Sequence, residues 1–204
     1  MKNYNTHLSS KIILMVEAIL LITSVLFCSI SVYRARIGIR KAIQQRMLDI
    51  ANCASGSIDG DVLGALTKDD VGSDVYNDLY GRLAVFRDNV ELEYIYSIKK
   101  EPDGQFVFTM DLDQETPAAY GDSVKYTEAL AQAGDGTSAV DEEPYTDKWG
   151  EFYSAYSPVF DSKGNVAGII AVDFSADWFD GQLTSQMRST VISYIIILLI
   201  SLLA

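Results

Sequence analysis

Hydrophobic residues gather at both ends of the chain, and the first of these runs predicts a membrane-crossing helix. Residues 12–33 are almost uniformly apolar, with Glu17 as their single charge. A helix of this length, at ~1.5 Å per residue, can cross a hydrocarbon core of ~30 Å. A cleaved signal peptide would have a shorter apolar run and a small-residue cleavage site, so we expect a retained anchor.

The second apolar run, residues 190–204, carries no charge and is shorter than a full span. It ends without a basic flank, so we expect the natural protein to continue beyond it, through a second span into a cytoplasmic region. The predicted parts are a cytoplasmic tail at 1–11, a transmembrane helix at 12–33, a single domain outside the cytoplasm at 34–189, and a truncated second transmembrane helix at 190–204.

The domain between the two runs starts with a helical pattern. Apolar side chains recur at helical spacing along residues 34–58 and form one stripe. The stripe comprises Ile39, Ile43, Met47, Ile50, Ala54 and Ile58. We therefore expect a long helix continuous with the first span, and a homodimer that forms through this 34–58 helix.

The pattern then changes from helix to strand. A second helix is expected at 73–89, after which apolar positions alternate over 92–98 and a Pro102-Asp103-Gly104 turn leads into a return strand at 105–112. A short helix at 124–132 and strands at 138–145, 151–160 and 166–174 complete the order. The expected fold class is α+β, with an antiparallel sheet of about five strands and a long N-terminal helix.

Charge and rare residues exclude several functions. The chain has 28 acidic and 16 basic residues and a net charge of −12, which disfavours nucleic acid as a partner. Its single histidine, His7, and its two cysteines, Cys28 and Cys53, cannot form a His/Cys zinc site or a serine-histidine-carboxylate triad within the folded part. We expect no catalytic domain in this chain and no cofactor.

One acidic segment imitates a calcium-binding loop. Asp111, Asp113 and Glu115 have the spacing of the first ligands of such a loop, but Thr116 stands where the loop needs glycine. We interpret the segment as a solvated acidic loop and predict no metal site.

Three stretches resemble a known family. YIYSI at 94–98, EEPYTD at 142–147 and YSPVFDSKGNVAGIIAVDFSADW at 156–178, placed between two membrane helices, resemble a Cache domain. The resemblance implies a PAS-like, extracytoplasmic sensor in a multi-pass protein of the bacterial cell membrane. It is closest to sensors that precede GGDEF-type diguanylate cyclases; histidine kinases and chemotaxis regions are the other outputs that such sensors control.

The same resemblance implies a ligand site. Amino-acid-sensing members hold their ligand with an Arg-x-Trp-Tyr element, a Tyr-x-Asp element and an aspartate that ends the last strand. Tyr145 and Asp147 match the second element, Asp173 matches the third, and Lys125 and Tyr126 fall where Trp-Tyr would be. The arginine has no counterpart, which puts an α-amino acid in doubt.

The chemistry of these positions leaves the ligand open. Two carboxylates facing one ammonium would recognise an amine, and Lys125 could supply a point charge for an acid. A small amine, an amino acid and an organic acid therefore all stay candidates. Asp147 could instead bond to its own backbone in a turn, whereas Asp173 follows Ile169 and Ala171 on one strand face, where apolar neighbours make a carboxylate costly without a function.

Aromatic residues near these positions are candidates for the pocket wall. Trp149, Tyr153 and Tyr156 would line it, although aromatic side chains on half-buried strands also build cores. The alternative to a sensor is a ligand-free structural or protein-interaction domain of a membrane protein.

The positive-inside rule argues against the expected topology. The basic residues after the first span outnumber the two before it, Lys2 and Lys11. They are Arg34, Arg36, Arg40, Lys41 and Arg46. A long loop translocates largely regardless of its charge, so we still expect the main domain outside the cytoplasm.

Overall fold

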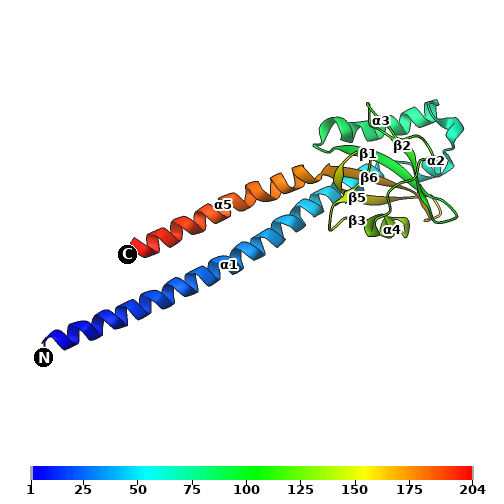
Figure 1. Cartoon of the computed structure of the whole chain (residues 1–204). Helices are drawn as coiled ribbons and strands as arrows, with labels where there is room; N and C mark the ends of the chain where they lie inside the picture. The colour runs from blue at the N-terminus through cyan, green and yellow to red at the C-terminus, as the bar shows by residue number, and fades with distance from the viewer. Residues whose placement is uncertain (1, 204) are drawn as a thin grey trace. The chain divides into compact units, whose positions relative to one another are not determined.

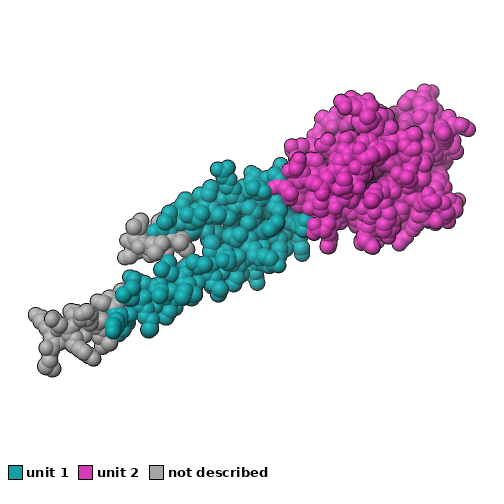
Figure 2. Space-filling model, viewed as in Figure 1, with its two compact units in different colours: residues 1–41, 181–204 teal, residues 42–180 magenta. Residues whose placement is uncertain are grey.

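The structure is a computed structural model that describes residues 2–203 (Figure 1). It divides into two compact units, one of residues 1–41 with 181–204 and one of residues 42–180 (Figure 2). The elements are α1 (Lys2–Gly56), α2 (Gly60–Ala65), η1 (Lys68–Asp70), α3 (Asp74–Asn89), β1 (Tyr94–Lys100), β2 (Phe106–Asp111), α4 (Glu128–Gly134), β3 (Ala139–Val140), β4 (Tyr145–Thr146), β5 (Glu151–Phe160), β6 (Val166–Ser175) and α5 (Ala176–Leu203).

The unit of residues 42–180 is built on one antiparallel sheet, which confirms the α+β class. The strand order is β2-β1-β6-β5-β3, and β4 also pairs with β5. The predicted strand at 138–145 is instead two short strands, because Ala139 pairs with Tyr156 while Tyr145 pairs with Phe152. The segment between them is longer than the stretch of β5 that it faces, so it loops out and turns the side chain of Asp141 inward.

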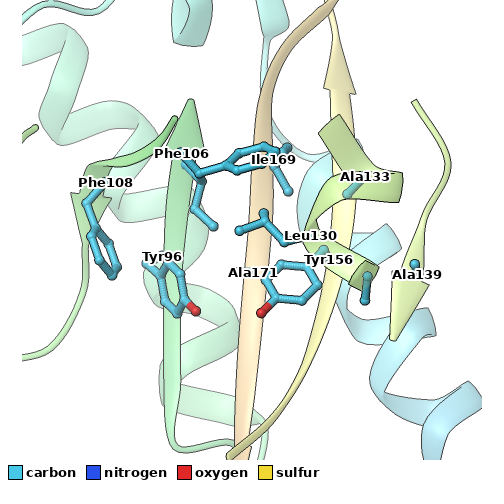
Figure 3. Close-up of a cluster of buried hydrophobic side chains, with 11 residues drawn as sticks. Tyr96, Phe106, Phe108, Leu130, Ala133, Ala139, Tyr156, Ile169 and Ala171 are labelled. Carbon is cyan, nitrogen blue, oxygen red and sulfur yellow. The ribbon is translucent and has the colours of Figure 1, made fainter. Parts of the chain in front are cut away.

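One face of the sheet carries a hydrophobic cluster beneath α4 (Figure 3). The cluster comprises Tyr96, Ile98, Phe106, Phe108, Ala129, Leu130, Ala133, Ala139, Tyr156, Ile169 and Ala171. We call this side of the sheet the α4 face. In Figure 3 the hydroxyl groups of Tyr96 and Tyr156 lie at the same end of the cluster, so the apolar packing gives way to polar groups there.

Helix α4 begins later than the sequence pattern suggests. The hydroxyl of Thr127 accepts a hydrogen bond of 3.1 Å from the backbone N–H of Leu130, which caps the helix at Thr127 rather than at residue 124. Lys125 and Tyr126 consequently lie in the loop before the helix, where their side chains are exposed.

The other face of the sheet packs against the second part of α1. The predicted stripe is buried there at Ile43, Met47 and Ala54, and the hydroxyls of Ser55 and Ser157 are 2.7 Å apart, joining α1 to β5. Because the stripe packs against the chain's own sheet, a dimer through this helix would have to use the helix's opposite side. The homodimer remains a prediction.

The other unit consists of helical segments only. Within the described residues, one helix is long and apolar enough to cross a membrane, starting at Leu14 in α1, and its apolar window is not buried. Residues 190–203 are helical as part of α5, and the second span remains a prediction. Met1 and Ala204, the ends of the predicted tail and second span, lie outside the described residues.

Candidate functional site

Asp173 is a buried charged residue on β6, which pairs with β1 on one side and β5 on the other. Asp173 is 4% exposed, and its Oδ1 accepts hydrogen bonds from Ser154 Oγ at 2.5 Å and from Tyr96 Oη at 3.1 Å. Pairing of β6 with both β1 and β5 brings these donors to it, since Ser154 stands directly opposite Asp173. Burial raises the pKa of Asp173 to about 8, and the two hydroxyl donors only partly oppose this rise.

A pocket of about 290 Å³, including space open to solvent, lies beside Asp173, and we call it the inner pocket. Its lining is Tyr94, Tyr96, Phe108, Asp111, Asp113, Asp147, Trp149, Phe152 and Asp173. These residues are either aromatic or acidic, and no basic side chain is among them. The inner pocket therefore offers negative charge and ring faces to whatever enters it.

The aromatic rings of the inner pocket pack in two groups, Tyr94 with Phe152, and Phe108 with both Tyr96 and Trp149. The ring centroids of Tyr94 and Phe152 are 5.5 Å apart at 73°, and those of Phe108 and Trp149 are 5.8 Å apart at 65°. Tyr96 and Phe108 are 5.0 Å apart. Such edge-on contacts hold the rings in place, and an aromatic face attracts a cation placed over it.

A β-bulge in β2 directs Asp111 into the inner pocket. Tyr96 pairs with Asp111 whereas Ile98 pairs with Phe108, so β2 has one residue more than β1 over this stretch. The extra residue shifts the alternation of side chains, and both Phe108 and Asp111 line the pocket. Burial raises the pKa of Asp111.

The acidic loop after β2 is closed by its own backbone. Asp111 accepts hydrogen bonds from the backbone N–H groups of Asp113 at 3.0 Å and Ala118 at 2.7 Å. Asp113 accepts from the backbone N–H and the hydroxyl of Thr116, both at 3.0 Å. Among the described residues no group of three or more histidine, cysteine or acidic side chains is placed to hold a metal ion.

A second pocket adjoins the first, and we call it the outer pocket. It encloses about 1040 Å³, including space open to solvent, and shares Tyr96, Phe108, Asp147 and Trp149 with the inner pocket. The residues that it adds are Asp122, Ser123, Val124, Lys125, Tyr126, Tyr145 and Lys148. Both lysines of the site thus belong to the outer pocket alone.

The turn between β4 and β5 contributes to the lining of both pockets. Asp147 Oδ1 accepts the backbone N–H groups of Trp149 at 2.8 Å and Gly150 at 3.2 Å, so this carboxylate caps its own turn and also lines both pockets. The indole N–H of Trp149 donates to the carbonyl oxygen of Thr116 at 3.1 Å, tying the turn to the acidic loop.

A second buried carboxyl group lies behind Asp173. Asp141 is 6% exposed, and its Oδ2 accepts from the backbone N–H of Ser154 at 3.3 Å and from Tyr156 Oη at 3.4 Å. Burial raises the pKa of Asp141 to about 6. Ser154 therefore bonds to both acids, and because its one hydroxyl proton goes to Asp173, Tyr145 Oη donates to Ser154 Oγ at 3.0 Å.

The structure brings six of the seven predicted contacts together. Those that line the two pockets are Lys125, Tyr126, Tyr145, Asp147, Trp149 and Asp173. Tyr153 lines neither pocket, because it lies between Phe152 and Ser154 on β5 and faces the opposite side of the sheet, where its ring stacks on Phe179 at 4.1 Å. Tyr156 is in the hydrophobic cluster. That the six bind a ligand remains a prediction.

Several pocket residues were not predicted from the sequence. They are Tyr94, Tyr96, Phe108, Asp111, Asp113, Phe152 and Lys148. Ser154, which lines neither pocket but donates to Asp173, was not predicted either. The alternation of Tyr94 and Tyr96 in the sequence indicated that both side chains lie on the same face of one strand. Whether that face of the sheet lines a pocket depends on the strand order, which the sequence pattern does not contain.

Comparisons with known proteins find similarity in fold only. No protein-family model matches the chain, and no curated protein matches it significantly in sequence. An extracellular ligand-binding receptor from Desulfohalobium retbaense is similar over 72% of this chain and 26% of its own, at 12% identity and a TM-score of 0.51. The E. coli DcuS sensor domain matches over 72% of this chain and 98% of its own, at 12% identity and a TM-score of 0.47.

A third solved structure is the ligand-binding domain of the Pseudomonas aeruginosa amino acid chemoreceptor PctC in complex with GABA. It matches over 74% of this chain and 63% of its own, at 18% identity and a TM-score of 0.47. The likeness to the Desulfohalobium receptor shows that this chain shares its fold with the matched quarter of that receptor. The expected diguanylate cyclase output remains a prediction.

Proposed function

We propose that this chain is the extracytoplasmic sensor part of a membrane receptor and that its inner pocket binds a small organic compound through an ammonium group. The observation that carries the proposal is the burial of Asp173 beside the inner pocket. Asp173 is a buried acid whose hydrogen-bond partners are hydroxyls, and it faces a pocket lined only by acids and aromatic rings.

An ammonium group supplies what this pocket lacks. A buried carboxylate is costly unless an opposite charge pairs with it, and the raised pKa of Asp173 reflects that cost. A bound ammonium group would stabilise the ionised form with a charge-assisted hydrogen bond. The rings of Tyr94, Phe108 and Trp149 would attract the same cation or pack on its carbon atoms.

The proposed route of the signal follows the last strand. Asp173 lies near the end of β6. This strand ends at Ser175, and α5 begins at Ala176 without an intervening loop. A ligand that binds one arrangement of the strand more tightly than another shifts the balance between them. The movement would reach α5 and from there the predicted second span and an output region, for which a diguanylate cyclase, a histidine kinase and a chemotaxis region are the candidates.

The membrane location rests on the apolar helix of α1. Its window from Leu14 is unburied, which fits a lipid-facing span. With the sensor unit outside the cytoplasm of a bacterial cell, the two pockets would face compounds in the surroundings.

A thermal-shift screen of the full chain in detergent tests the proposal. Primary amines and amino compounds should raise the melting temperature, whereas acids without an amine should not. Asp173→Asn should abolish the rise, and Asp69→Asn, which alters an exposed acid in η1 away from both pockets, should preserve it. A rise with organic acids alone contradicts the ammonium site, and no rise with any compound favours a structural or protein-interaction domain.

A further inference from the structure

Charge divides between the two units of the chain. The unit of residues 42–180 has 27 acidic and nine basic residues, whereas the other unit has one acidic and seven basic residues. Arg34, Arg36 and Lys41 belong to the basic unit and follow the apolar run of α1. We propose that these three side chains, which we call the basic collar, bind the anionic headgroups of phospholipids at the membrane surface. This binding is independent of the ligand of the inner pocket.

The position of the collar along α1 places it at the level of the headgroups. Every charge between Glu17 and Asp49 is basic. Tyr33, the last residue of the apolar run, is 67% exposed, and tyrosine is enriched where a span meets the headgroups. At ~1.5 Å per residue, residues 34–41 extend about 12 Å beyond the run. The headgroup layer is roughly 5–7 Å deep on each side, and charges act over a Debye length of about 8 Å beyond it. The whole collar is therefore within reach of anionic headgroups.

The collar side chains are available and point in different directions. All three are exposed, and none forms an ion pair with another residue that the structure describes. At 3.6 residues per turn, Arg34 and Lys41 share one side of α1 and Arg36 lies on the opposite side. A partner helix would contact one side of α1 only. A layer of lipid headgroups surrounds a span, so it can reach charges on both sides.

The chemistry of the collar favours lipid phosphate over other anions. The guanidinium groups of Arg34 and Arg36 match the geometry of a phosphodiester, and Lys41 adds a point charge. Nucleic acid would be repelled by the acidic unit of residues 42–180. A second copy of the chain, parallel in the same membrane, would bring its own collar to the same depth, where the two sets of positive charge repel each other. Anionic lipid between the copies would neutralise both.

Lipid association of the full chain in nanodiscs tests the proposal. The discs consist of phosphatidylcholine with a trace of spin-labelled phosphatidylglycerol or spin-labelled phosphatidylcholine, and the spectrum gives the fraction of each probe that the protein immobilises. At low salt the protein should prefer phosphatidylglycerol about fivefold or more, the equivalent of ~1 kcal/mol for one basic residue near an anionic surface. Because salt screens exposed charges, the preference should decline toward equality as the ionic strength rises.

Substitutions assign the preference to the collar. A variant with glutamine at all three collar positions keeps long polar side chains without charge, and it should lose most of the preference for phosphatidylglycerol. The matched control removes three exposed bases of the unit of residues 42–180 and should keep the preference. The control substitutions are Lys68→Gln, Arg82→Gln and Lys163→Gln.

A fluorophore beside the collar locates the bound lipid. Ile37 is 41% exposed between the collar residues, so Ile37→Cys can carry the dye once Cys28 and Cys53 are replaced by serine. Energy transfer to headgroup-labelled phosphatidylglycerol should exceed transfer to headgroup-labelled phosphatidylcholine, and the difference should disappear in the collar variant.

Three results would overturn the proposal. Equal association of the two lipids at low salt means that the collar binds no anionic headgroup. A preference that survives in the collar variant, or falls equally in the control, places the lipid elsewhere on the chain. If the collar variant keeps its lipid preference but changes from dimer to monomer in detergent, as sedimentation would show, the partner of the collar is a second copy. None of these measurements involves a compound in the inner pocket, so they leave the ammonium site untouched.

Discussion

Ser154 and Asp173 stand directly opposite each other on β5 and β6, and the serine hydroxyl donates a 2.5 Å hydrogen bond to the carboxyl group. The adjacent residues of the same ladder, Tyr153 and Phe174, also pair, and they face the other side of the sheet. There Tyr153 stacks on Phe179 and Phe174 packs on Trp178, both in the first turns of α5. The Ser154–Asp173 pair beside the inner pocket is thus adjacent to the Tyr153–Phe174 pair, which contacts the start of α5.

Replacing Ser154 with alanine should weaken ligand binding. The variant leaves Asp173 with Tyr96 as its one remaining hydroxyl donor, and a hydrogen bond to a charged group contributes about 1.5–3 kcal/mol. We therefore expect the dissociation constant of an amine ligand to rise about tenfold or more, measured by calorimetry. Ser162→Ala, on the exposed β5–β6 turn, should leave it unchanged. An unaltered affinity in Ser154→Ala would show that ionised Asp173 does not hold the ligand.

The stability of the unliganded protein should fall as the pH rises. Burial raises the pKa of Asp173 from 3.8 to about 8, so the folded state keeps a proton that the unfolded state has lost. The stabilisation is complete below pH 3.8 and is lost progressively until the pH passes about 8. Its slope is at most about 1.4 kcal/mol per pH unit.

Denaturant unfolding at a series of pH values measures this slope. Asp173→Asn keeps an oxygen that can accept from Ser154 and Tyr96 but cannot titrate, so the decline between pH 6 and 8 should disappear. Asp141→Asn should flatten the curve at lower pH instead, because the pKa of Asp141 is raised only to about 6. Stability that increases from pH 6 to 8 in the wild-type protein would contradict a protonated Asp173.

Binding of an ammonium ligand should release a proton. The ligand favours the ionised carboxylate and so lowers the pKa of Asp173 from about 8, and below that value the proton leaves as the ligand enters. Calorimetry near neutral pH, in buffers that differ in ionisation enthalpy, counts the released protons. Affinity should rise with pH by up to about tenfold per unit below the pKa. Uptake of a proton, or a pH-independent affinity, would place the cation away from Asp173.

The sequence predicted the secondary structure where the pattern is local. The helix at 73–89 and the strands at 151–160 and 166–174 depend on alternation and capping within each segment, and the structure has them as α3, β5 and β6. The start of α4 was missed because Thr127 caps it, and the break between β3 and β4 was missed because it depends on pairing with β5.

The site could be predicted only in part for the same reason. Asp173 was indicated by its strand face, since Ile169 and Ala171 precede it on that face. Ser154 pairs with Asp173, so its neighbour Tyr153 faces the other side of the sheet. This register is a relation between β5 and β6 and cannot be deduced from the sequence of either strand alone. The bulge that turns Asp111 inward is likewise a relation between two strands.

The stack of Tyr153 on Phe179 should carry the signal without contributing to binding. Tyr153→Leu keeps an apolar side chain but removes the ring contact at 4.1 Å. We expect ligand affinity within about twofold of the wild type, because Tyr153 lines neither pocket. The ligand-dependent change in the environment of a spin label at Asp180→Cys, in a background without Cys28 and Cys53, should be lost. A label that still responds in Tyr153→Leu would show that β6 alone moves α5.

The location of the sensor unit can be tested at Ser162. This residue is exposed in the turn between β5 and β6, so a cysteine there should react without disturbing the sheet. With Cys28 and Cys53 replaced by serine, we expect a membrane-impermeant maleimide to label Ser162→Cys in intact cells as fully as in lysed cells. A cysteine in place of Lys2, in the predicted cytoplasmic tail, should react only after lysis. Labelling of the second position and not the first in intact cells would reverse the topology, in favour of the positive-inside count.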